Sequence, residues 1–194
     1  IYELRGDVSS QFISGLLFAL PLLNGDSEIR MTTPLESAAY TDMTIQALSR
    51  FSIQIEKNAA GFQIRGGQKY RSPGPLRTEG DWSSAAFFLT AGAIGKQVSC
   101  DGLSLNSCQP DKSILSFLQR FGAKTETAEK TVKIFPALLS GIEIDASYAP
   151  DIVPILAIAA CAAHGETVIR NAQRLKLKES DRLTAIAECI SRLG

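Results

Sequence analysis

The sequence predicts an α/β (α+β) fold made of repeated strand–helix–strand–helix units, and three observations lead to this class. The motif GDVSSQF at Gly6–Phe12 returns as GDWSSAAF at Gly80–Phe87, and self-similarity of this kind indicates a repeated structural unit. Each motif is followed by an apolar helical stretch, a glycine turn and a β-rich run. A third, more diverged copy covers residues 148–171, where the serines are missing but Asp151 stands at the expected helix start.

Each copy continues with a second helix whose apolar residues share one face. We expect these helices at residues 38–51, 111–121 and 180–193. Copies one and two then end in predicted hairpins, at residues 51–67 and 123–137, and copy three stops before its own. The first helix of each copy is apolar all round, as in residues 154–163, which predicts a helix buried on every side. Ser72-Pro73-Gly74-Pro75 is rich in turn formers and is the predicted linker after copy one.

The composition excludes several classes of function. The 194 residues are 45% apolar, and 20 basic residues balance 20 acidic ones, so the electrostatic footprint of a nucleic-acid binder or a polybasic membrane anchor is missing. No apolar stretch reaches the roughly 18 residues of a membrane span. Four cysteines without CxxC spacing predict reduced, buried thiols and a cytoplasmic protein. No P-loop, GxGxxG or metal-ligand spacing occurs, so we predict neither a cofactor nor a metal.

GDVSSQF places Ser9 and Ser10 at the start of a helix, where free backbone N–H groups and the helix dipole favour an anion. The hydroxyls and the Gln11 amide add further donors, which suit a phosphate monoester. A simple helix cap by Ser9 explains the same residues. The repeat favours function, because Ser83-Ser84 of copy two keeps the expected cap while Ala85 replaces the amide.

LKLKESDRL packs Lys178, Glu179 and Arg182 into one turn that enters a helix, with Ser180 or Asp181 as its expected cap. A solvated charged face explains such a run. A lysine and a carboxylate that exchange protons with a substrate explain it equally well, because close opposite charges shift each other's proton affinity. Asp151, which opens the apolar helix of copy three, is either an N-cap or a general base.

Taken together, GDVSSQF, GDWSSAAFFL and RLKLKESDRL resemble the 5-enolpyruvylshikimate-3-phosphate synthase family along essentially the whole chain. The family fold is an inside-out α/β barrel of two lobes, each built from three βαβαββ units with interior helices. The resemblance makes residues 1–76 the last unit of one lobe and residues 77–194 the first two units of the other. It also implies a middle portion of a longer enzyme, which we expect to be a monomer at full length.

The resemblance implies transfer of the enolpyruvyl group of phosphoenolpyruvate to the 5-hydroxyl of shikimate 3-phosphate, through a tetrahedral intermediate. Its implied ligands of shikimate 3-phosphate are Ser9, Ser10, Gln11 and Ser37, with Tyr40 as a neighbour.

The same resemblance assigns the proton chemistry to the third copy. Asp151 is the implied base at the 5-hydroxyl, Lys178 binds substrate and shuttles protons, Glu179 protonates the methylene carbon, and Arg182 holds phosphoenolpyruvate. Because the family's N-terminal Lys-Ser pair and several of its arginines lie outside these residues, we expect the chain alone to be inactive.

Three alternatives stay open at this point. UDP-N-acetylglucosamine enolpyruvyl transferase shares the architecture but is not known for the SSQ and KESDR motifs. A phosphate-ligand-binding module without catalysis fits the helix start alone. An RNA 3'-phosphate cyclase needs a nucleotidyl-accepting histidine. The single histidine, His164, precedes Gly165 at an expected helix end, which argues against this class.

Overall fold

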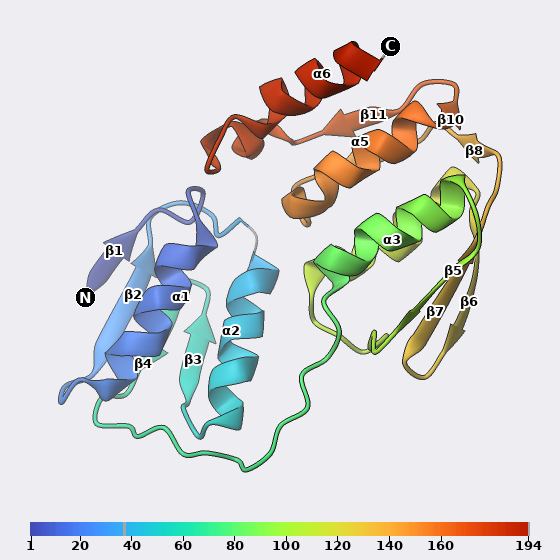
Figure 1. Ribbon diagram of the computed structural model, residues 1–194. Coiled ribbons are helices and arrows are strands. Elements are labelled where there is room, and N and C mark those ends of the chain that lie inside the picture. Colours follow the sequence, from blue (N-terminus) through green and yellow to red (C-terminus); the bar gives the residue numbers. More distant parts are fainter. Residues whose placement is uncertain (37, 194) are drawn as a thin grey trace. The chain divides into compact units, whose positions relative to one another are not determined.

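The computed structural model describes residues 1–36 and 38–193. The chain forms two compact units, Ile1–Arg77 and Thr78–Gly194 (Figure 1). We call them the N-terminal unit and the C-terminal unit and describe each by itself. Ser37, one of the predicted ligands, lies outside the described residues.

The N-terminal unit has the order βαβαββ that the repeat predicts. Its elements are β1 (Tyr2–Leu4), α1 (Ser10–Ala19) with a 3-10 turn at Leu20–Leu22, β2 (Ser27–Met31), α2 (Ala38–Arg50), β3 (Ile55–Asn58) and β4 (Gly61–Ile64). The sheet order is β1-β2-β4-β3, in which only β1 and β2 run parallel. The β3–β4 hairpin is thus confirmed, and Asn58 closes it by accepting from the N–H groups of Ala60 and Gly61 at 2.8 and 2.9 Å.

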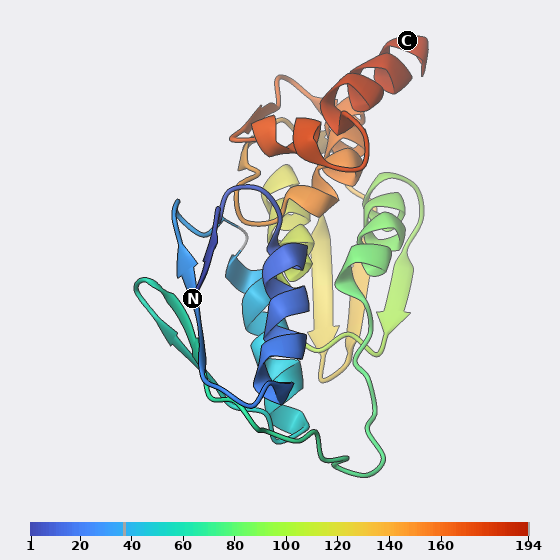
Figure 2. The same ribbon diagram turned by 90° about the vertical axis from the view of Figure 1, so that its left-hand side faces the viewer.

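α1 and α2 lie side by side over the sheet (Figure 1, Figure 2). The apolar core between these layers consists of Ile13, Leu17, Leu20, Ile29, Leu48, Ile53, Phe62 and Ile64. Burial of these side chains is the main favourable term for the unit. It fixes the start of α1, where GDVSSQF lies, above the carboxyl end of β1.

The C-terminal unit begins with copy two. Its elements are α3 (Trp82–Ile94), β5 (Val98–Asp101), a 3-10 turn (Pro110–Ser113), α4 (Ile114–Phe121), β6 (Lys124–Ala128) and β7 (Thr131–Phe135), and the sheet order is β5-β7-β6. The predicted hairpin β6–β7 is confirmed. No strand lies between β4 and α3 in the described residues, although the repeat predicts one. Pro73 and Pro75 have no N–H to donate to a ladder, and Gly80 N–H bonds Gly102 instead, at 2.8 Å.

Copy three completes the C-terminal unit. It contains β8 (Leu139–Ser140), β9 (Glu143–Asp145), α5 (Val153–Cys161), β10 (Ala163–His164), β11 (Val168–Arg170), a 3-10 turn (Gln173–Leu177) and α6 (Arg182–Leu193). β8 pairs with β10 and β9 with β11, both in parallel. The sequence suggested that His164 lies at the end of a helix. The structure places it in the short strand β10 instead. α5 packs between α3 and α6 (Figure 1).

The prediction that the first helices are buried on every side is wrong for the described chain. Phe12 of α1 is 65% exposed and Phe88 of α3 is 63% exposed, and Ile158 of α5 is also exposed. Apolar composition shows what a side chain prefers, whereas burial also needs a partner on each face. Within each unit the neighbouring strands and helices cover only part of the surface of these helices. Cys161 and Cys189 are likewise exposed free thiols rather than buried ones.

Candidate functional site

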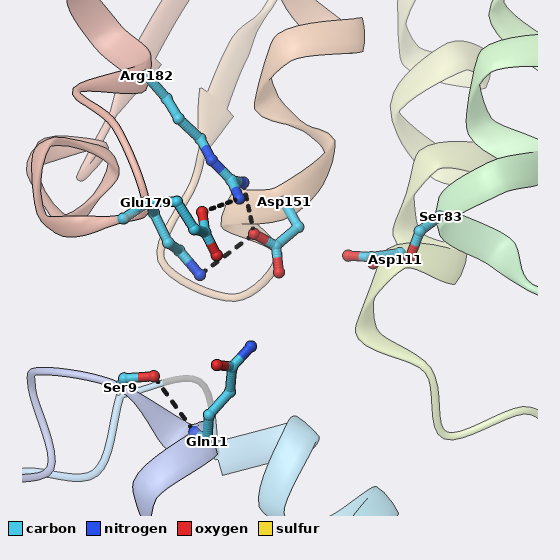
Figure 3. Close-up of polar contacts among 8 residues, drawn as sticks. Ser9, Gln11, Ser83, Asp111, Asp151, Glu179 and Arg182 are labelled. Atoms are coloured by element: carbon cyan, nitrogen blue, oxygen red, sulfur yellow. Dashed lines mark hydrogen bonds and ion pairs between the residues drawn. The ribbon is translucent and has the colours of Figure 1, made fainter.

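Asp151 lies in the 3-10 turn Pro150–Ile152 that leads into α5. The N-cap residue of α5 is Ile152 and not Asp151, whose carboxylate faces two cations of the next segment (Figure 3). Oδ1 accepts from Arg182 Nη1 at 2.8 Å and lies 3.2 Å from Lys178 Nζ. The structure thus joins Asp151 to the KESDR segment, which is about 30 residues further along the chain.

The KESDR segment forms the approach to α6. Lys178 is extended and follows the 3-10 turn that ends at Leu177. Asp181 is the helix cap, since its carboxylate accepts from the Thr184 N–H at 3.1 Å and from the Thr184 hydroxyl at 2.9 Å. This cap places Arg182 at the first position of α6, from which it reaches Asp151 and, at 2.7 Å, Glu179.

We call Asp151, Lys178, Glu179 and Arg182 the charged cluster. The side chains of Asp151, Lys178 and Arg182 are 25–31% exposed, whereas that of Glu179 is 71% exposed. Burial acts to lower the pKa of Arg182, but the hydrogen bond to Glu179 and the charge of Asp151 outweigh it and raise that pKa. The pKa of Glu179 is lowered by a backbone hydrogen bond first and by Arg182 second. Asp151 and the two cations are therefore partly shielded from water, whereas Glu179 is exposed.

An apolar groove of about 320 Å³ lies against one side of Arg182. Its walls come from Phe87 of α3, Pro154 and Ile158 of α5, and Ile186 and Ile190 of α6. Apolar walls limit the hydration of a guanidinium, which strengthens its interaction with an anion.

In the N-terminal unit, Ser9 is the N-cap of α1, which is the simple helix-cap role that the sequence allowed. Its Oγ accepts from the Gln11 N–H at 3.3 Å, and Ser10 is the first helical residue. The first turn contains no acidic residue, so the positive end of the helix dipole is not neutralised from within the helix. The Gln11 amide projects away from the ribbon (Figure 3). We call Ser9, Ser10 and Gln11 the SSQ site.

The loop before the SSQ site is held by contacts that the sequence did not reveal. A Cβ on Gly6 would lie 2.6 Å from the Pro34 carbonyl oxygen, so the loop packs closely on this segment. Gly6 N–H donates to the Thr33 hydroxyl at 2.9 Å, and that hydroxyl donates to Asp7 at 3.0 Å. Arg5 donates to both oxygens of Asp7, at 3.0 and 2.8 Å. Arg5 is the main reason that the pKa of Asp7 is held far below its usual range.

The same motif in copy two is capped differently from what the sequence suggested. Asp81, not a serine, caps α3 by accepting from the Ser83 N–H at 2.9 Å. The Ser84 hydroxyl donates to Asp81 at 2.6 Å, and the Ser83 hydroxyl donates to the buried Asp111 (Figure 3). A carboxylate is a stronger acceptor than a hydroxyl. Asp81 has Glu79 and not an arginine two residues before it, and its carboxylate caps the helix.

Tyr40 lies in the first turn of α2, and its carbonyl accepts from the Thr44 hydroxyl at 3.1 Å. The Thr44 hydroxyl is also 2.8 Å from that of Ser14, which ties α2 to α1. Tyr40 and the SSQ site therefore belong to two packed helices of the N-terminal unit. The charged cluster belongs to the C-terminal unit.

Two negative findings hold for the described residues. No helix among them is long and apolar enough to cross a bilayer. Within residues 1–36 and 38–193, no three histidine, cysteine, aspartate or glutamate side chains form a group suited to a metal ion.

The fold and these motifs define an enolpyruvyl transferase class. An EPSP synthase from Acinetobacter baumannii superposes with a TM-score of 0.74 and 27% identity, over 96% of this chain and 43% of that one. The enolpyruvyl transferase NikO from Streptomyces tendae, at 19% identity and a TM-score of 0.59, covers 77% of this chain and 36% of its own and shares the fold.

The family follows from the sequence comparison. The family model of EPSP synthase (3-phosphoshikimate 1-carboxyvinyltransferase) matches residues 2–194. The chain therefore belongs to the EPSP synthase family. The 3-phosphoshikimate 1-carboxyvinyltransferases of Clostridium kluyveri and Clostridium acetobutylicum are 46% and 47% identical over the whole chain. The chain spans 45% of the length of each of these relatives.

Proposed function

We propose that the full-length protein carrying this chain transfers the enolpyruvyl group of phosphoenolpyruvate to the 5-hydroxyl of shikimate 3-phosphate. One observation carries the proposal: Asp151, Lys178, Glu179 and Arg182 meet in one cluster, in a chain of the EPSP synthase family. The reaction needs a group that removes a hydroxyl proton, a group that protonates carbon and fixed cations for dianionic substrates. The charged cluster supplies each of these chemistries.

In the addition step, we assign Asp151 as the base that takes the 5-hydroxyl proton while the oxygen attacks the central carbon of phosphoenolpyruvate. Glu179 delivers a proton to the methylene carbon, which gives the tetrahedral intermediate. In the elimination step a methyl proton leaves, the double bond reforms and phosphate departs. Lys178 carries protons between these groups, and Arg182 holds phosphoenolpyruvate by its charge.

We assign shikimate 3-phosphate to the SSQ site of the N-terminal unit, with Ser37 and Tyr40 as further contacts. Support comes from the N-terminus of α1, which offers backbone N–H groups, two hydroxyls and an amide without an acid in its first turn. Because shikimate 3-phosphate is assigned to the N-terminal unit and the proton chemistry to the C-terminal unit, we propose that a single unit does not turn over substrate. We also propose that the full-length protein is a monomer.

The test is a steady-state assay of the full-length protein with both substrates, in which phosphate release is measured. Asp151→Ala and Lys178→Ala are each expected to lower kcat about 10²- to 10⁴-fold, the range for loss of a general acid or base. Lys176→Ala is the matched control, since Lys176 is an exposed lysine two residues from Lys178. Wild-type rates in either of the first two variants would remove the charged cluster from the mechanism.

The alternatives are less well supported. UDP-N-acetylglucosamine transfer is not favoured, because the matching family model and the two Clostridium relatives are EPSP synthases. Adding UDP-N-acetylglucosamine in place of shikimate 3-phosphate tests it directly, and no phosphate release is expected. An RNA 3'-phosphate cyclase has no support in the matched family. A binding module without catalysis predicts that the full-length protein binds shikimate 3-phosphate and releases no phosphate.

A further inference from the structure

The two copies of the motif differ at the residue before the glycine. In copy one, Arg5 precedes Gly6 and binds both carboxylate oxygens of Asp7. In copy two the corresponding residue is Glu79, which cannot pair with Asp81 and instead accepts from Ser107 at 2.9 Å and Gln109 at 3.0 Å. The charge at this position is therefore reversed between copies that otherwise share glycine, aspartate and two serines.

The aspartates behave differently as a result. Asp81 is the cap of α3 and also accepts from the Ser84 hydroxyl. Asp7, held by Arg5 and Thr33, leaves the cap of α1 to Ser9. Among the described residues, no hydroxyl bond from Ser9 or Ser10 to a carboxylate is seen, whereas both serines of copy two donate to one.

The position of Asp7 has an electrostatic consequence for an anion at the SSQ site. Asp7 precedes Ser9 by only two residues. A negative carboxylate this close to the helix start would repel a phosphate bound there. The paired guanidinium cancels this charge. Stability is a poor explanation for the pair, because the side chains of Arg5 and Asp7 are 66% and 30% exposed, and exposed ion pairs contribute little.

We propose that Arg5 is a positioning residue of the SSQ site, which acts through Asp7. Arg5, with Thr33, turns the Asp7 carboxylate away from the helix start and neutralises it. The hydroxyls of Ser9 and Ser10 and the end of the α1 dipole then serve the phosphate of the substrate. The inference rests on the proposed binding of shikimate 3-phosphate at this helix start.

The experiment measures the dissociation constant of shikimate 3-phosphate by calorimetry, using the full-length protein. Arg5→Ala is expected to weaken binding about tenfold, as an uncompensated charge near a partly exposed anion does. Arg5→Ala combined with Asp7→Asn is expected to recover binding to within about twofold of wild type, because the repelling charge is gone. Arg30→Ala is the matched control: Arg30 is another arginine of this unit that pairs with Glu28 and Glu3.

The outcomes separate the possible errors. If the double variant stays as weak as Arg5→Ala, then Arg5 contacts the ligand itself or supports the fold, and the inference is wrong. The inference is also wrong if Arg5→Ala binds as wild type does. A wild-type protein that fails to bind shikimate 3-phosphate at all contradicts the proposed function instead. KM for phosphoenolpyruvate is expected to change less than KM for shikimate 3-phosphate in Arg5→Ala.

Discussion

The starts of α1 and α3 show how one sequence motif forms two different sets of hydrogen bonds. Both have glycine, aspartate and two serines in the same spacing. At α3 these groups bond to one another and to the buried Asp111, so their capacity for hydrogen bonds is used inside the fold. At α1 the aspartate is bound by Arg5 and Thr33, and the serines remain at the protein surface. We propose that the partners of its aspartate decide whether this repeated motif becomes structural or ligand-binding.

The largest expected effect tests the ligand-binding side of this comparison. Gln11→Ala converts the SSQ of copy one into the SSA of copy two. Loss of an amide that bonds a charged substrate costs about 1.5–3 kcal/mol, so kcat/KM for shikimate 3-phosphate is expected to fall about 10- to 100-fold. Stability is expected to be unchanged, because Gln11 is exposed. Gln63→Ala, at an exposed position of β4, is the control.

A second substitution tests the structural side. Ser83→Ala removes a hydroxyl donor from Asp111, which is 2% exposed. Leaving a buried carboxylate short of a partner costs about 1–3 kcal/mol in unfolding free energy. Ser10, which corresponds to Ser84 of copy two, is half-buried but does not cap α1. Ser10→Ala is therefore expected to cost less than about 0.5 kcal/mol. Urea unfolding of the full-length protein measures both.

Equal losses of stability in Ser83→Ala and Ser10→Ala would contradict the division between a structural and a ligand-binding motif. A selective loss in Ser83→Ala with an unchanged KM would sharpen it. Asp111 has further interactions of its own. Changing the serine and not the aspartate removes one donor and keeps the aspartate that makes those interactions.

Local features of the fold could be predicted from the sequence. The hairpins β3–β4 and β6–β7 and the second helices follow from periodicity and turn residues, which act within a few positions. The capping of α3 could not be predicted, because Asp81 and Ser83 are both favoured cap residues, for helix starts that differ by two residues. The residue that becomes the cap depends on its partners. In copy one the partner is Arg5, a sequence neighbour that binds Asp7; in copy two it is Asp111, which tertiary packing brings to Ser83.

The candidate site was predicted in parts. Resemblance to the family placed Asp151 and the KESDR segment in one site, and the ion pairs of Lys178 and Arg182 with Asp151 now give that pairing a geometry. Residue spacing alone left a solvated charged face equally open. The Arg5–Asp7 pair was missed, although opposite charges two residues apart beside a glycine were a visible signal.

The smallest expected effect concerns the free energy of unfolding at low pH. The pKa of Asp81 is lowered, chiefly by the hydroxyl of Ser84, below the ordinary value of 3.8. A carboxylate whose folded pKa is depressed contributes stability above its unfolded pKa and loses it as the pH falls through the folded value. Asp81→Asn keeps a good helix cap without the titration. Between about pH 4 and pH 2, its unfolding free energy is therefore expected to fall less steeply than that of wild type.

Glu126→Gln, at an exposed position of β6, is the control for this acid series. It removes a carboxylate that caps no helix, so its slope is expected to follow that of wild type. If Asp81→Asn also followed wild type, Asp81 would not be held by its serine in solution, and the two helix starts would differ less than their hydrogen bonds indicate. If its slope is flatter, the aspartate of copy two is a titrating part of the fold. The two copies would then differ in that Arg5 binds the aspartate of copy one, whereas the aspartate of copy two caps its helix.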